Sequence, residues 1–217
     1  MYCSGEVRWF YRGTAADSAE RWINAGELAR NQAERTDRYL LLPGCRTAGI
    51  KLRDGNFEIK GQTSGNEFIV FADNVDGYRN TWVRWSRPID DFSDLAQNVR
   101  KDESWILVRK RRKVRLFSLD TGIPEEVESD APGLTAGCQV EKTAIRALPL
   151  PPADGAPQDA DWSAAEDWWT FSFESFGRPE SLLRNLDTTV SHVASAEPGL
   201  LLRSEYSMSY PEWLSAL

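Results

Sequence analysis

The chain has 217 residues, of which 41% are hydrophobic, and it carries a formal net charge of −7 at pH 7. A chain of this length and apolar content can bury a core without disulfides, so we expect a folded protein rather than a disordered one. The acidic charge argues against general nucleic-acid binding, and no run approaches the roughly 20 apolar residues of a membrane span.

The N-terminal part of the chain predicts two strands and a helix. Residues 5–12 have the alternation of a strand. Asp17 and Glu20 have the spacing of a capping box, which predicts a short helix that continues to about Ala29. A further strand is expected at 37–42.

The segment 49–60 carries a strong hairpin signal. Two alternating strands flank Asp54-Gly55, a pair that is typical of two-residue hairpin turns. Successive residues of a strand point to opposite faces. One face is therefore apolar, with Ile50, Leu52, Phe57 and Ile59, and the other is charged, with Lys51, Arg53, Glu58 and Lys60.

The middle of the chain continues with strands and one helix. Residues 67–72 and 80–86 predict a second strand pair, and residues 89–99 have helical spacing of their apolar side chains. A long strand is expected at 105–119, interrupted in hydrophobicity only by a basic run, and another strand at 139–148.

The C-terminal part begins with a segment rich in Pro, Ala, Gly and Asp. This segment, 149–161, is predicted to be a flexible or disordered loop. Residues 168–176 predict a strand, and Pro179 suits the first position of an amphipathic helix. A short strand is expected at 200–203, and residues 210–214 predict a docked C-terminal turn.

These elements amount to about eight strands and three helices, with the strands in long sequential runs. This order favours an antiparallel α+β architecture over an alternating parallel one. The sequence shows no internal repeat and no linker, so we expect a single domain over residues 1–217.

The cysteines and the N-terminus bear on the compartment. Cys3, Cys45 and Cys138 are an odd number without metal-type spacing, so they are interpreted as reduced thiols. The first residues run straight into a strand pattern and lack an apolar signal region. We therefore expect a cytoplasmic protein.

Charged residues occupy one face of several predicted strands. Glu6 and Arg8 lie opposite Val7 and Trp9 on the first strand. The basic strand carries charge on both faces, so it lacks an ordinary apolar core face at its centre. Two interpretations follow: an open sheet with a solvated outer surface, or a closed barrel whose polar interior binds an anion.

Seven short motifs follow one another along the chain. They are Glu6-Val-Arg-Trp-Phe10, Thr36-Asp-Arg-Tyr39, the hairpin pair Lys51-Leu-Arg53 and Glu58-Ile-Lys60, Arg109-Lys-Arg-Arg112, Gln139-Val-Glu141, Phe173-Glu174 and Ser209-Tyr-Pro-Glu-Trp-Leu214. In this order the chain resembles the CYTH, or triphosphate tunnel metalloenzyme, superfamily. The resemblance implies an antiparallel eight-stranded, tunnel-like β-barrel with flanking helices.

The resemblance also implies a ligand and a set of site residues. The ligand would be a phosphorylated small molecule: a triphosphate, a nucleotide or a polyphosphate. Its phosphates would be bound by Arg8, Lys51, Arg53, Lys60, Arg84, Lys110 and Arg112, and Mg²⁺ or Mn²⁺ by Glu6, Glu141 and Glu174. The chain departs from the family pattern at three positions, where Arg8 and Ser172 replace acids and Phe10 replaces a lysine.

Two functions from different classes remain open at this point. The first is a metal-dependent, triphosphatase-like phosphohydrolase, in which the basic residues offset charge in the transition state. The second is a binding module that grips a phosphorylated ligand without metal chemistry, with Arg8 as one more anion contact or as part of an ion pair. The sequence assigns neither catalytic residues nor a protein partner.

Overall fold

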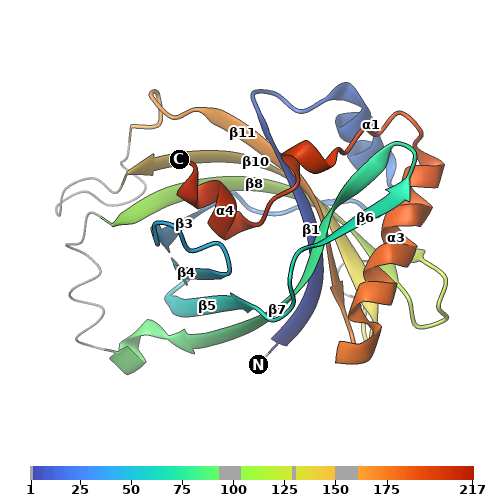
Figure 1. The fold of residues 1–217 in the computed structure, drawn as a ribbon, viewed down its shortest axis with the longest axis horizontal. Coiled ribbons are helices and arrows are strands. Elements are labelled where there is room, and N and C mark those ends of the chain that lie inside the picture. The colour runs from blue at the N-terminus through green and yellow to red at the C-terminus, as the bar shows by residue number, and fades with distance from the viewer. Residues whose placement is uncertain (1, 93–103, 129–130, 150–160) are drawn as a thin grey trace.

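The computed structural model describes residues 2–92, 104–128, 131–149 and 161–217 (Figure 1). Of the helix predicted at 89–99, only a 3₁₀ turn at Ile89–Phe92 falls within these residues. The remainder of that helix, and residues 150–160 of the predicted loop, lie outside the described residues.

Eight antiparallel strands form a closed barrel. Their order around the barrel is β1, β11, β10, β8, β3, β4, β5 and β7, and β7 pairs with β1 to complete the circle. The bounds are Tyr2–Arg12 (β1), Arg35–Leu40 (β3), Ala48–Arg53 (β4), Asn56–Gln62 (β5), Val75–Pro88 (β7), Trp105–Ser118 (β8), Gly137–Pro149 (β10) and Asp167–Phe176 (β11). The predicted α+β barrel is confirmed, and the alternative of an open sheet is wrong.

Three shorter strands extend the barrel. The strands β2 (Arg30–Asn31) and β9 (Glu125–Val127), which the sequence did not predict, both pair with β8. The strand β6 (Glu67–Ala72) pairs only with the first part of β7, outside the barrel. By contrast, the strand expected at 200–203 is reduced to one bridge between Val75 and Leu202.

The turn between β4 and β5 has the predicted two-residue form. Asp54 and Gly55 adopt φ angles of 48° and 74°. Positive φ at both central positions matches the right-handed twist of the flanking strands, which is why Asp-Gly is favoured there. The turn sets the register that places Lys51 opposite Glu58, so the two charged side chains share one face.

The main hydrophobic core lies outside the barrel wall. Val7 and Trp9 of β1 point outward and pack with side chains of α1 (Asp17–Ala25) and α3 (Leu182–Ala196). Figure 1 shows both helices against the outer surface of the barrel. Because side chains alternate along a strand, the residues that alternate with these two, Glu6 and Arg8, point into the barrel.

The predicted capping box at the start of α1 is wrong. The helix begins at Asp17, so Ala16 is the N-cap residue and no side chain caps the helix. Asp17 and Glu20 both lie in the first turn, where carboxylates favour the positive end of the helix dipole. Glu20 instead forms an ion pair with Lys142 of β10.

A short C-terminal helix closes one end of the barrel interior. This helix, α4 (Tyr210–Ser215), has a capping box in which Ser209 accepts from the Glu212 amide and the Glu212 carboxylate accepts from the Ser209 amide at 2.7 Å. Trp213 stacks on Phe10, with ring centroids 5.1 Å apart, and meets Trp168 edge-on. The predicted docked C-terminal turn is confirmed.

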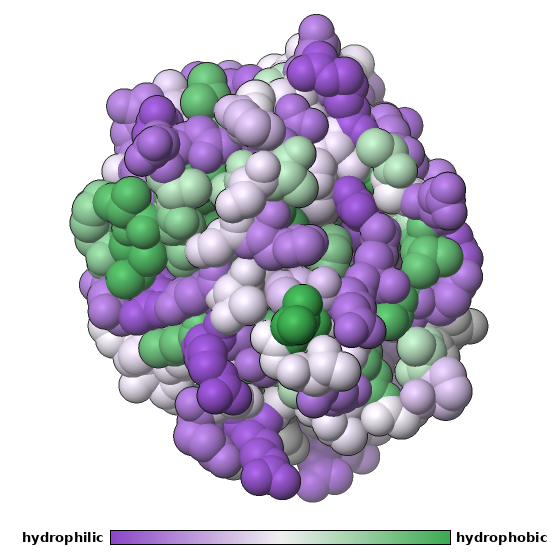
Figure 2. All heavy atoms as spheres, turned by 90° about the vertical axis from the view of Figure 1, so that its right-hand side faces the viewer, coloured by the Kyte–Doolittle hydropathy of each residue, from purple (hydrophilic) through white to green (hydrophobic). Residues whose placement is uncertain are grey.

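The outer surface near α3 and β6 carries scattered apolar side chains. On β6 and β7 the side chains of Phe68, Val70 and Tyr78 are exposed. Figure 2 shows this side of the molecule, on which hydrophilic side chains separate the hydrophobic patches. Within the described residues, no helix has both the length and the apolar character needed to cross a membrane.

Candidate functional site

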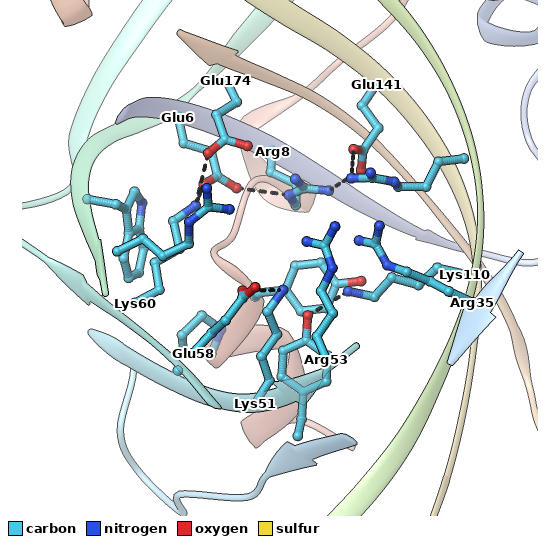
Figure 3. A pocket seen from close by; sticks show the side chains of 17 residues that line it. Glu6, Arg8, Arg35, Lys51, Arg53, Glu58, Lys60, Lys110, Glu141 and Glu174 are labelled. Carbon is cyan, nitrogen blue, oxygen red and sulfur yellow. Dashed lines mark hydrogen bonds and ion pairs between the residues drawn. The ribbon is translucent and has the colours of Figure 1, made fainter. Parts of the chain in front are cut away.

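The barrel interior contains a cavity of about 130 Å³ (Figure 3). All ten residues that the sequence predicted for a phosphate and metal site line it: Glu6, Arg8, Lys51, Arg53, Lys60, Arg84, Lys110, Arg112, Glu141 and Glu174. They come from seven strands that are distant in sequence. The closed barrel therefore brings the whole predicted set into one space, whatever role each residue has.

The basic strand β8 divides its charge between the two faces of the barrel wall. Lys110 and Arg112 point into the cavity, as predicted. The neighbouring Arg109 points outward and lies over the ring of Trp162, at 4.2 Å from the ring centroid. The long basic run therefore supplies only alternate residues to the site.

Arg8 lies between two carboxylates on one side of the cavity. Its Nε donates to Glu6 at 3.0 Å, and its Nη1 lies 3.4 Å from Glu141 and donates to Thr170 at 3.0 Å. We call the side formed by Glu6, Glu141 and Glu174 the acidic wall. In Figure 3 these three acids and Arg8 lie across the cavity from Lys51 and Arg53.

The carboxylates of the acidic wall are already paired with cations. Glu6 also forms an ion pair with Lys60, and Glu141 with Arg112 at 2.8 Å. Burial alone would raise the pKa of Glu6, but Lys60 and Arg8 outweigh burial and lower this pKa to about 2. Burial is likewise outweighed at Glu141, whose pKa Arg112 and Arg8 lower to about 2. Both groups are therefore ionised at neutral pH.

Another buried acid, which the sequence did not assign to the site, neutralises the opposite side. Asp37 of β3 lies 3.2 Å from both Lys110 and Arg35 and 3.9 Å from Lys51, and it is 0% exposed. Burial would raise its pKa, but Lys110, Lys51 and Arg35 together lower it to about 2. The alternation Arg35, Asp37, Tyr39 on a strand was the signal that could have revealed this group.

The cavity keeps an excess of positive charge. Within the described residues, eight basic side chains line it, against the four lining glutamates and Asp37 behind them. Two of the cations are the least neutralised. Within the described ranges, Arg84 has no carboxylate within 4 Å, and Arg53 forms an ion pair only with Asp54, an exposed residue of the hairpin turn. These two guanidinium groups are therefore the most available to a ligand.

Among the described residues, the acids are not gathered around one point as ligands of Mg²⁺ or Mn²⁺ would be. Such hard cations require several oxygen ligands around one point. The guanidinium of Arg8 lies between Glu6 and Glu141, so a cation there would lie beside a fixed positive charge. Within the part of the chain that the structure describes, no group of three or more acids, histidines or cysteines is arranged to hold a metal. The residues as placed fit an anion better than a metal ion.

The lowered pKa values predict a stability that depends on pH in the acid range. Glu6, Asp37 and Glu141 have pKa values of about 2 in the folded state, below their ordinary values of 4.5, 3.8 and 4.5. Their contribution is therefore full above about pH 5 and is lost as the pH falls toward 2, at about 2–3 kcal/mol for one such carboxylate. Urea unfolding between pH 7 and pH 2.5 measures this loss.

Glu141→Gln provides the control for that experiment. Glutamine resembles the protonated acid, so the difference in stability between the wild type and this variant should shrink as the pH approaches 2. A difference that stays constant between pH 7 and pH 2.5 would show that Glu141 does not stabilise the fold as an ion.

The fold and the site define a closed antiparallel barrel with a charged, net-basic interior. Compared with models of known protein families and with curated protein sequences, the chain matches none. Any statement about its activity therefore depends on the cavity itself.

Proposed function

We propose that the cavity binds a phosphorylated small molecule, such as a triphosphate, a nucleotide or a polyphosphate. The observation that carries this proposal is the excess of cations in an enclosed cavity. Among the described residues, no carboxylate of the cavity lies within ion-pair distance of Arg53 or Arg84. A guanidinium group presents parallel N–H donors that suit phosphate oxygens. In Figure 3 the guanidinium of Arg53 points into the cavity, toward Arg8 and Glu141.

We also propose that the chain is a divergent member of the CYTH superfamily and that it is cytoplasmic. The closed eight-stranded barrel supports the first proposal, because the ten site residues that the resemblance implies all line its interior. The second is supported by the three cysteines, all of them free thiols, as expected in a reducing compartment.

Titration calorimetry with tripolyphosphate in the presence of EDTA tests the binding proposal. We expect binding by the wild type and a loss of affinity of about 10–100-fold in Arg53→Ala and in Arg84→Ala, since each removes charged hydrogen bonds to the ligand. Arg111→Ala is the matched control, because Arg111 is an exposed residue on the outer face of β8. The proposal would be contradicted if the wild-type protein bound none of tripolyphosphate, ATP and longer polyphosphates.

Hydrolysis of a phosphoanhydride is the second candidate function. It is favoured by the position of Glu174, a half-buried acid of the same cavity whose one ion pair within the described residues, with Lys60, is long at 3.5 Å. Release of phosphate from tripolyphosphate with Mg²⁺ or Mn²⁺, abolished in Glu174→Ala, would establish an enzyme. Binding without turnover would establish a binding module.

A further inference from the structure

We propose that Arg8 is a built-in cation that occupies the acidic wall in place of a divalent metal, so that this cavity binds its anion without metal and excludes metal for as long as Arg8 is present. The part of this inference that concerns the anion rests on the proposed function. The part that concerns metal exclusion stands on the geometry of Arg8 alone.

The guanidinium of Arg8 joins carboxylates from two different strands. Glu6 lies on β1 and Glu141 on β10, and β11 runs between these strands. The contacts of 3.0 Å to Glu6 and 3.4 Å to Glu141 place one cation at the point where the two acids converge. A divalent ion bound to the same oxygens would need the space that the guanidinium fills.

Several contacts hold Arg8 in this position. Thr170 of β11 accepts a hydrogen bond from Nη1, and the guanidinium carbon lies 5.3 Å from the centre of the Tyr210 ring. The side chains of Arg8, Glu6 and Glu141 are only 8%, 9% and 7% exposed. The cation is therefore part of the barrel wall rather than a mobile surface group.

The charge of Arg8 is permanent, because arginine stays protonated in proteins. A bound metal dissociates or is removed by a chelator, whereas this cation does not leave. Its hydrogen bonds within the described residues use Nε and Nη1, so Nη2 remains available to donate to an anion in the cavity. Arg8 can thus neutralise the acidic wall and contact the ligand at once.

The test compares the wild type with Arg8→Gln and Arg8→Glu, with Mn²⁺ alone and tripolyphosphate alone as the two probes. Electron paramagnetic resonance measures bound Mn²⁺, and calorimetry in EDTA measures tripolyphosphate. We expect no stoichiometric Mn²⁺ on the wild type and one Mn²⁺ on at least one folded variant. We also expect the affinity of Arg8→Gln for tripolyphosphate in EDTA to fall at least about tenfold.

Arg12→Gln is the matched control, since Arg12 lies on the same strand with a side chain that is 70% exposed, and it should gain no Mn²⁺. Stoichiometric Mn²⁺ on the wild type would overturn the inference, and this measurement needs no variant to fold. Folded Arg8 variants that gain no Mn²⁺ would also overturn it. If tripolyphosphate fails to bind the wild type, the proposed function fails, while the Mn²⁺ measurements still decide the role of Arg8.

Discussion

Replacing Asp37 with asparagine is expected to destabilise the folded protein by about 3–5 kcal/mol. The substitution keeps the shape of the side chain but removes the negative charge that Lys110, Arg35 and Lys51 share. Breaking a buried ion pair on one side is costly because the remaining charge stays in a poorly solvated place. Here more than one cation would be left, and Lys110 is itself only 4% exposed.

Urea unfolding at pH 7 measures this loss, with Glu34→Gln as the control. Glu34 lies just before β3 and pairs with Arg109 on the outer surface, at 3.7 Å and with 54% of its side chain exposed. An exposed pair of this kind contributes at most about 1 kcal/mol. Equal effects of the two substitutions would mean that solvent or a bound anion, rather than Asp37, compensates the buried cations.

Replacing Trp213 with alanine is expected to destabilise the protein by about 3–5 kcal/mol, the usual range for a buried tryptophan or phenylalanine. Trp213 is 1% exposed and packs against Phe10, Trp168 and Tyr210 at the closed end of the barrel. Its indole N–H has no hydrogen-bond partner among the residues that the structure describes. The loss should therefore come from packing alone, so Trp213→Phe should recover much of it.

Leu217→Ala is the control for the closed end, because Leu217 lies near Trp213 in sequence but is 57% exposed. Its effect on the unfolding free energy should stay within about 0.5 kcal/mol. If Trp213→Ala is equally mild, α4 does not close the barrel in solution.

The sequence predicted the strands well because their alternation is strong. The hairpin at 49–60 is one example, since its turn residues and its two faces appear as expected. The inward pair Lys110 and Arg112 is another. Alternation alone could not show whether the charged faces point to solvent or to a closed interior. The answer depends on the pairing of β7 with β1, which joins segments that are distant in sequence.

The charge balance of the cavity was the part that sequence reasoning did not provide. Arg35 and Asp37 alternate on a short strand, and their importance appears only when Lys110 and Lys51 are placed around them. Similarly, the position of Arg8 between Glu6 and Glu141 depends on strands separated by more than 130 residues. Local pattern fixes the direction of a side chain but not the identity of its distant partner.

The double pairing of β1 has a consequence for the order in which the chain assembles during synthesis. The first part of β1, Tyr2 to Glu6, pairs with β7, and the part from Gly5 to Arg12 pairs with β11. The ribosome makes β11 some 160 residues after β1, so the first strand keeps an unpaired edge until most of the barrel exists. Non-local pairing of this kind slows folding. We therefore expect the charged lumen to form late, as the closing event of folding rather than its nucleus.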